Sequence, residues 1–229
     1  MDNILKILRS IPLFQGLSES QLGQIRDIAR DKLYDKGKEI FAEGEEGDGF
    51  YVVASGQVKI YKLSLEGKEQ ILHIYGPGNS FGEVAVFSGK RFPANASTLL
   101  KSHLLFFPRT AFVSLISGNP SLCLNLLADL SMRLRQFTVQ IENLTLKEVP
   151  GRLASYLLYL SDAEGQGDRL SLGISKGQLA SLLGTIPETL SRILSRMTSA
   201  DLIEVKGKEI TIRDRDGLQE LAETGKLGG

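Results

Sequence analysis

The spacing of apolar residues divides this chain into stretches of different periodicity. Up to about residue 30 the apolar positions recur at helical spacing, as at Leu8, Leu22 and Ile25, which predicts short helices. From residue 40 to about residue 107 short apolar runs alternate with glycines, a pattern typical of an antiparallel β-roll. The runs expected to form strands cover residues 40–41, 50–53, 58–61, 70–74 and 102–107.

A long helix is predicted after the roll, from about residue 119 to residue 147. Its apolar stripe follows a 4-4-3-4-3 spacing, close to a coiled-coil seam, and consists of Leu126, Leu130, Leu134, Phe137, Ile141 and Leu144. The stripe could pack on the roll alone, but a helix of roughly 40 Å, at 1.5 Å per residue, outreaches such a small domain. We therefore expect a parallel homodimer.

Two short helices around a tight turn are predicted in the last third of the chain. Ser175 is a suitable N-cap with Gln178 three residues later, and Gly184 ends this first helix. Thr185 is expected to cap the second helix, with Glu188 at its third position. Such a helix pair, followed by a hairpin, is the outline of a winged helix-turn-helix.

The second helix of this pair has one apolar and one polar face. Its apolar stripe consists of Leu190, Ile193, Leu194 and Met197. The outward set consists of Glu188, Thr189, Ser191, Arg192, Ser195 and Arg196. Residues 202–205 and 209–212 flank Lys206-Gly207-Lys208, which predicts a hairpin whose lysines meet phosphate. Helix-turn-helix packing also occurs in proteins that never touch nucleic acid, but capping, wing and outward arginine together favour double-stranded DNA as a partner.

Charge and composition add few constraints. The chain has 229 residues with 42% hydrophobic and 24% charged residues, as expected of a globular protein. Residues 150–229 contain 10 Lys plus Arg against 11 Asp plus Glu, so they do not form the basic domain that electrostatics alone would favour. The single cysteine, Cys123, is expected to be a buried thiol, and one cysteine excludes a four-cysteine iron–sulfur cluster within the chain.

These patterns predict an α+β protein with three parts. The expected domains are a β-roll effector-sensing domain with N-terminal helices over residues 1–118, a dimerisation helix over residues 119–147 and a winged helix-turn-helix over residues 148–229. We find neither a signal peptide nor an apolar run of membrane-spanning length, and we therefore expect a cytoplasmic protein without a membrane partner.

Several motifs match one known family. Residues 40–56 follow the glycine-spaced signature of a cyclic-nucleotide-binding fold, residues 81–86 match the start of its phosphate-binding cassette, and residues 149–152 match a hinge. In this order the three parts resemble the Crp–Fnr family of bacterial transcription regulators. The resemblance implies a homodimer that binds a small effector, reorients two recognition helices over one operator and contacts RNA polymerase.

The chain departs from the relatives that bind cyclic AMP. In those relatives an arginine near the cassette's end neutralises the cyclic phosphate. Here Arg91 is out of register, and Phe92 or Pro93 takes that position. We therefore do not expect cyclic AMP, and the effector stays unknown. The resemblance places the effector pocket at Phe81, Gly82, Glu83, Val84, Pro93, Ala94, Asn95, Phe137 and Thr138. Glu83 has two interpretations, a ligand contact or an acceptor of backbone N–H bonds.

Haem is a possible cofactor. Residues 78–96 are similar to the branch that controls hybrid-cluster-protein genes under nitrosative stress, which implies nitric oxide sensed through haem. His73 could ligate haem, but a lone histidine among strand residues is more often structural. Neither His73 nor His103 matches a family ligand position well.

The resemblance extends to DNA readout. Glu188, Ser191 and Arg192 match the E-x-x-S-R pattern of the Fnr branch, which implies base reading of an inverted repeat with TTGA-like half-sites, Arg192 gripping guanine. The phosphate contacts expected beside them are Ser175, Lys176, Thr185, Thr189, Arg196, Lys206 and Lys208. An enzyme is not expected, because the sequence contains neither a P-loop nor spaced metal ligands. A cyclic-nucleotide- or metabolite-binding module that regulates a protein partner is the alternative.

Overall fold

The computed structural model describes residues 3–88, 91–164 and 167–225. The chain forms two compact units, residues 1–134 and 135–229, and the division between them falls inside the long helix α5 (Pro120–Leu146). Helices and antiparallel sheets occur together, so the predicted α+β class is confirmed.

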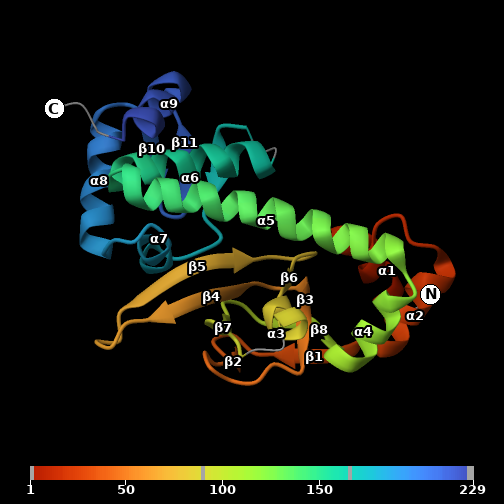
Figure 1. Cartoon of the computed structure of the whole chain (residues 1–229). Helices are drawn as coiled ribbons and strands as arrows, with labels where there is room; N and C mark the ends of the chain where they lie inside the picture. Colours follow the sequence, from red (N-terminus) through yellow and green to blue (C-terminus); the bar gives the residue numbers. More distant parts are fainter. Residues whose placement is uncertain (1–2, 89–90, 165–166, 226–229) are drawn as a thin grey trace. The chain divides into compact units, whose positions relative to one another are not determined.

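The first unit is a β-roll flanked by helices (Figure 1). One antiparallel sheet has the strand order β1-β8-β3-β6, and the other has the order β2-β7-β4-β5. The strands are β1 (Arg30–Tyr34), β2 (Glu39–Phe41), β3 (Gly49–Ser55), β4 (Val58–Leu63), β5 (Glu69–Tyr75), β6 (Ser80–Phe81), β7 (Asn95–Thr98) and β8 (Ser102–Pro108). The helices are α1 (Asn3–Ser10), the 3₁₀ turn η1 (Pro12–Phe14), α2 (Glu19–Ile28), α3 (Glu83–Ser88), α4 (Arg109–Ser117) and the first half of α5.

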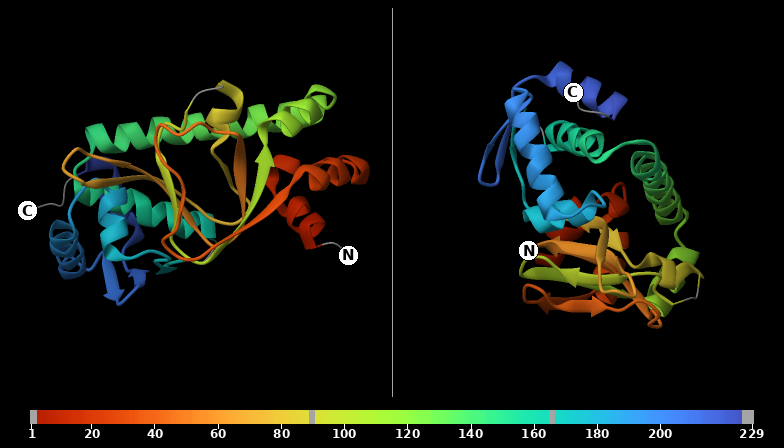
Figure 2. Two further views of the ribbon diagram at one scale, coloured as in Figure 1. Left: turned by 90° about the horizontal axis from the view of Figure 1, so that it is seen from below. Right: turned by 90° about the vertical axis from the view of Figure 1, so that its left-hand side faces the viewer.

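Strand β3 is buried on both faces because it separates two apolar clusters. Side chains alternate across a strand, so Phe50 and Val52 join one cluster while Tyr51 and Val53 join the other. The first cluster packs β3 and β8 against the N-terminal helices, which lie at one end of the sheets (Figure 2). The second cluster fills the interior of the roll with aromatic rings from Phe41, Tyr51, Tyr75, Phe81, Phe92 and Phe106.

All five predicted strand runs lie in observed strands, and three strands of the first unit, β1, β6 and β7, were not predicted. Strand β1 is polar and almost fully exposed, and β7 is a short polar run, so neither has an apolar pattern. Gly49 lies within β3. A Cβ there would come within 2.3 Å of the Phe107 carbonyl oxygen, so this glycine permits close strand pairing.

The second unit contains the rest of α5 and a helix-turn-helix with a three-stranded wing. Its helices are α6 (Val149–Glu164), α7 (Lys176–Leu182), α8 (Pro187–Ser199) and α9 (Arg215–Thr224). Strands β9 (Arg169–Ser171), β10 (Ile203–Lys206) and β11 (Glu209–Ile212) pair antiparallel in the order β10-β11-β9. The predicted two-stranded wing is confirmed, and β9 adds a strand that was not predicted.

Candidate DNA-binding surface and effector region

Helix α7 begins as the sequence predicts. The Ser175 hydroxyl accepts from the Gln178 backbone N–H at 3.2 Å, and the Gln178 side chain accepts from the Ser175 N–H at 2.7 Å. This capping box satisfies two donors that the first turn would otherwise leave open. The helix ends at Leu182, and Gly184 takes a left-handed conformation with φ of 68° in the turn. Only glycine adopts this conformation without steric cost, which explains the sharp change of direction.

Helix α8 begins one residue later than predicted. The N-cap is Ile186, with no side-chain cap, and Pro187 occupies the first turn; the prediction that Thr185 caps this helix is wrong. Because proline has no N–H and a preset φ, the helix starts at Pro187 without a polar cap. The Thr185 backbone N–H instead donates to the Ala180 carbonyl at 2.9 Å, which holds the turn closed.

The exposed face of α8 carries the predicted base-reading residues. Glu188, Ser191 and Arg192 are exposed, and Ser195 and Arg196 continue the same face. Beneath them Leu190, Ile193, Leu194 and Met197 are buried, as predicted. The Arg192 Nη2 donates to the Thr189 hydroxyl at 3.2 Å, an interaction within the helix that the sequence did not suggest. The buried apolar residues therefore fix α8 in place, while its polar face stays exposed.

One of the two wing lysines, Lys206, has an ion-pair partner within the wing. Lys206 and Lys208 are exposed on either side of Gly207, which has a φ of 65°. Lys206 Nζ lies 2.5 Å from a carboxylate oxygen of Glu204, and the other oxygen of Glu204 accepts from Arg213. Hydrogen bonds from Lys206 and Arg213 lower the pKa of Glu204, so this carboxylate is ionised at neutral pH.

In the roll, Phe92 occupies space beside the start of the phosphate-binding cassette. Gly82 has a φ of 84°, and a Cβ on it would lie 3.3 Å from the Phe92 ring and 3.5 Å from the Phe41 ring. Arg91 turns outward, where its guanidinium donates to the Gly44 carbonyl at 3.1 Å and faces Glu46 at 3.7 Å. The Phe92 ring thus lies beside Gly82, and the Arg91 guanidinium is engaged by Gly44 and Glu46.

Other residues predicted for the effector pocket are used in packing or face solvent. Asn95 is buried, and its side chain accepts from the Glu43 N–H at 3.0 Å and donates to the Tyr61 carbonyl at 3.3 Å. Phe81 and Ala94 are buried in the roll, Pro93 is exposed, and Val84 is 51% exposed. Phe137 and Thr138 are exposed on the part of α5 that belongs to the second unit.

Arg133 is the residue that the sequence analysis missed in this region. Its Nη2 donates to the Ser80 carbonyl at 2.7 Å and to the Ser80 hydroxyl at 2.8 Å. Its Nη1 lies 3.3 Å from Glu83, and its Nε lies 2.9 Å from Asp129. The guanidinium also lies over the Tyr75 ring, 5.3 Å from its centre. Arg133 thereby joins α5 to the strand and helix that begin the cassette.

Glu83 is therefore an ion-pair partner, which neither interpretation included, and its carboxylate also accepts from a backbone N–H, as one of them expected. It is 5% exposed; burial raises its pKa, and Arg133 opposes that shift. A signal for this pairing existed in the sequence. Leu122, Leu126, Asp129 and Arg133 follow a 4-3-4 helical spacing, so the face of α5 that packs on the roll turns from apolar to charged.

The predicted dimer seam includes one residue, Leu126, that the structure buries. Leu126 is 6% exposed and packs inside the roll's own core, whereas its neighbour Leu127 is 60% exposed. The exposed stripe has a regular 3-4-3-4-3 spacing and consists of Leu127, Leu130, Leu134, Phe137, Ile141 and Leu144. The predicted stripe began on one face of α5 and crossed to the other, which explains its irregular first step.

Neither histidine is placed to hold haem. His73 is packed against Tyr75 with ring centroids 4.3 Å apart, inside a roll whose interior is already filled by aromatic rings. Burial and the nearby Arg133 lower the pKa of His73 to about 4. His103 contacts the Asp31 carboxylate. The residues present therefore do not fit a haem group at either histidine.

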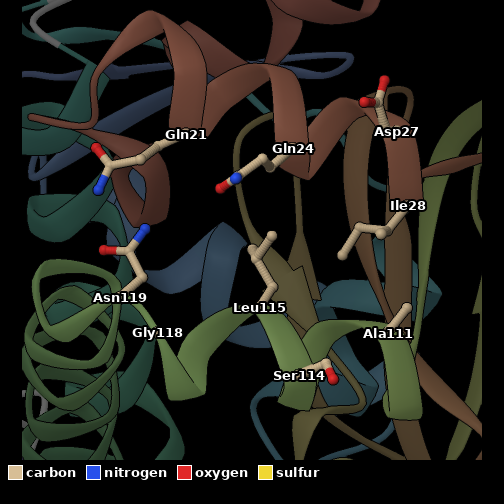
Figure 3. Close-up of a pocket in the computed structure, with 9 residues that line it drawn as sticks. All are labelled: Gln21, Gln24, Asp27, Ile28, Ala111, Ser114, Leu115, Gly118 and Asn119. Atoms are coloured by element: carbon tan, nitrogen blue, oxygen red, sulfur yellow. The ribbon is translucent and has the colours of Figure 1, made fainter.

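A separate groove of about 530 Å³ lies between α2 and α4 (Figure 3). Gln21 and Gln24 of α2 line one side of the groove, and Leu115 and Ser114 of α4 line the other. The other residues that line it are Asp27, Ile28, Ala111, Gly118 and Asn119. This groove involves none of the residues predicted to contact an effector or DNA.

Within the described ranges, no three His, Cys, Asp or Glu residues are grouped as a metal ion would require. Over the same part of the chain, no single helix has the length and apolar character needed to cross a membrane; only the bent pair α4 and α5 passes that test together.

Comparison with known proteins assigns a family to both units. Residues 31–119 match the cyclic nucleotide-binding domain, and residues 151–221 match the Crp-like helix-turn-helix domain. A CRP-like cAMP-activated global transcriptional regulator of Mycobacterium tuberculosis is 31% identical over 221 residues, which are 95% of this chain and 99% of the relative. The chain therefore belongs to the Crp–Fnr family of DNA-binding transcription regulators.

Overall identity does not separate the branches of this family. The fumarate and nitrate reduction regulatory protein of Escherichia coli is also 31% identical, over 211 residues, 90% of this chain and 84% of the relative. The solved structure of FixK2 from Bradyrhizobium japonicum is 25% identical with a TM-score of 0.76, and the match covers 88% of this chain and all of that one. Effector and operator must be argued from individual residues.

Proposed function

We propose that this protein is a homodimeric regulator that reads an inverted repeat with TTGA-like half-sites through α8. The supporting observation is the exposed row of Glu188, Ser191 and Arg192 above a fully buried apolar stripe. In the major groove, arginine can grip guanine O6 and N7, a carboxylate can accept from cytosine N4, and serine can serve several bases. Arg192 therefore reads the guanine of each half-site.

Phosphate contacts around this row position the helix on the duplex. The residues proposed for them lie at the N-terminus of α7, on α8 with its preceding turn, and at the wing: Ser175, Lys176, Thr185, Thr189, Arg196, Lys206 and Lys208. Such contacts fix orientation without carrying sequence information.

Dimerisation through α5 supplies the second half-site reader. The exposed stripe that starts at Leu127 has the a and d spacing of a two-stranded coiled coil. Two-fold symmetry matches an inverted repeat with half-site centres about 34 Å apart. The dimer acts on transcription in the cytoplasm together with RNA polymerase.

A small effector other than cyclic AMP switches the protein. Phe92 lies beside Gly82, and Arg91 points outward. Arg91 could therefore not neutralise a cyclic phosphate buried at this position. The Glu83–Arg133 pair joins the roll to α5 and is the element through which effector binding would act on the dimer helix. The haem and nitric oxide hypothesis receives no support from His73 or His103.

A gel-shift titration tests the proposal. We expect the purified protein to bind a TTGA inverted repeat more tightly than a scrambled duplex by about 10³-fold or more, with no change on adding cyclic AMP. Equal affinity for both duplexes would contradict DNA readout by α8 and favour the alternative of a module that regulates a protein partner. Tightening by cyclic AMP would contradict the effector assignment alone.

A further inference from the structure

The solvent face of the wing carries alternating charges. In the β10–β11 hairpin Glu204 pairs with Thr211 and Lys206 pairs with Glu209, while Ile203 pairs with Ile212. Because side chains alternate along a strand, the first two pairs share the exposed face and the isoleucine pair faces the core. The charged residues of the wing therefore lie side by side on one surface.

Arg213 extends this row directly beyond β11. Its backbone N–H donates to the Leu202 carbonyl at 2.9 Å, which fixes its position beside the start of β10. Its side chain is 51% exposed, and its guanidinium contacts the carboxylate of Glu204. Arg213 thus has the exposure and the fixed backbone that a phosphate-contacting residue needs.

Glu204 lies between two cations. One of its oxygens faces Lys206 and the other faces Arg213, while the Glu204 side chain is only 27% exposed. A carboxylate and a phosphate oxygen compete for the same donors, since both are anionic acceptors. Lys206 and Arg213 can therefore bind phosphate at full strength only after leaving Glu204.

Resting on the proposed DNA-binding function, we propose that Arg213 is a third phosphate-contacting cation of the wing and that Glu204 competes with DNA for Arg213 and Lys206. As a consequence, Glu204 lowers the electrostatic affinity of the regulator for DNA of any sequence. Occupancy of an operator then depends on base reading by α8. This agrees with a C-terminal region of 10 basic and 11 acidic residues over positions 150–229.

The expected size of the effect on DNA affinity follows from counterion release. Each phosphate neutralised on B-DNA contributes about −0.9 to the slope of log affinity against log salt. One additional full contact therefore tightens binding by roughly five- to tenfold near 0.1 M salt. Glu204→Gln removes the competing charge but keeps the side-chain shape, and it should release up to two such contacts.

The experiment measures affinity for a random duplex and for the TTGA repeat at salt concentrations between about 50 and 200 mM. We expect Glu204→Gln to tighten binding to both duplexes by the same factor and to steepen the salt slope by about 1 to 2. The control is Glu223→Gln, an exposed carboxylate on α9 that changes the net charge equally. It should have a clearly smaller effect; an equal effect of both variants would overturn the proposal.

A protein that lacks both wing cations tests whether Glu204 acts through Lys206 and Arg213. In a Lys206→Ala, Arg213→Ala protein, adding Glu204→Gln should change affinity no more than Glu223→Gln does. In the Glu204→Gln protein, adding Arg213→Ala should flatten the slope by about 1. Weaker binding by a Glu204→Gln protein with an unchanged melting temperature would also overturn the inference. Equal affinity of the unmodified protein for the TTGA repeat and for the random duplex would instead contradict the proposed function.

Discussion

Phe92 stacks on Phe41 inside the β-roll, with ring centroids 3.7 Å apart and planes inclined by 8°. The stacked pair lies beside Gly82, where it forms part of the apolar interior of the roll. At this position the roll is packed with its own aromatic side chains.

Phe92 should therefore be a stability determinant. We expect Phe92→Ala to lower the free energy of unfolding by about 3–5 kcal/mol, because it leaves a cavity next to Phe41. Phe87 on α3 is 42% exposed, and its replacement by alanine should cost less than about 1 kcal/mol. Urea unfolding of both variants measures this, and equal losses would show that Phe92 does not fill the core.

The Glu83–Arg133 pair should be costly to break on one side. We expect Arg133→Leu to destabilise the protein by about 3–5 kcal/mol, because it leaves the buried Glu83 carboxylate without its cation. Adding Glu83→Gln to that variant should recover part of the loss. Arg135→Leu, an exposed position two residues along α5, is the control. A double variant no more stable than the single one would contradict the coupling.

Stability should fall with acid because of His73. Its pKa is lowered to about 4 in the folded protein, first by burial and then by Arg133. The unfolded chain, with an ordinary pKa near 6.5, then binds more protons between these values, so folding stability present above pH 6.5 is lost as the pH falls toward 4. At pH 5 the loss is about 2 kcal/mol.

The measurement compares urea unfolding at pH 7.5 and pH 5 for the unmodified protein and for His73→Phe. Between these two pH values the free energy of unfolding should fall by about 2 kcal/mol less in the variant than in the unmodified protein, since phenylalanine has no proton to bind. Parallel pH dependences in the two proteins would rule out a neutral buried His73.

The stripe on α5 should set the oligomeric state. Ile141 belongs to the regularly spaced stripe and is 63% exposed, whereas Val139, two residues earlier, is 50% exposed on another face. We expect Ile141→Arg to produce a monomer in sedimentation velocity, because a charge in a coiled-coil core stays unpaired. Val139→Arg should stay dimeric. Dissociation by both substitutions, or by neither, would refute the assigned seam.

Base reading and phosphate contact should respond differently to substitution. Arg192→Ala should lose about 1–3 kcal/mol of discrimination at the half-site guanine, while Lys206→Ala should weaken binding to all sequences alike. Titrations against matched and guanine-substituted repeats separate the two effects, with Arg30→Ala in the roll as a neutral control. Similar losses for Arg192→Ala and Lys206→Ala would contradict their assigned roles.

Local patterns in the sequence were enough to predict several elements of this fold. The Ser175–Gln178 capping box, the buried stripe of α8 and the wing around Gly207 depend on residues a few positions apart, so their spacing predicts them. The amphipathic α8 therefore also predicted which side chains face solvent. The α8 N-cap was predicted one residue too early, since proline at the first turn removed the need for the Thr185 hydroxyl.

Only the tertiary structure decided the relationships between distant residues. Arg133 lies 50 positions from Glu83, and Phe92 lies 51 positions from Phe41, so no local period connects them. Likewise, the choice between Leu126 and Leu127 for the seam depends on which face of α5 the roll covers. Sequence by itself determined the elements and their amphipathic faces, because periodicity is a local property; the filled roll, the buried ion pair and the restrained wing cations required folding to bring separate segments into contact.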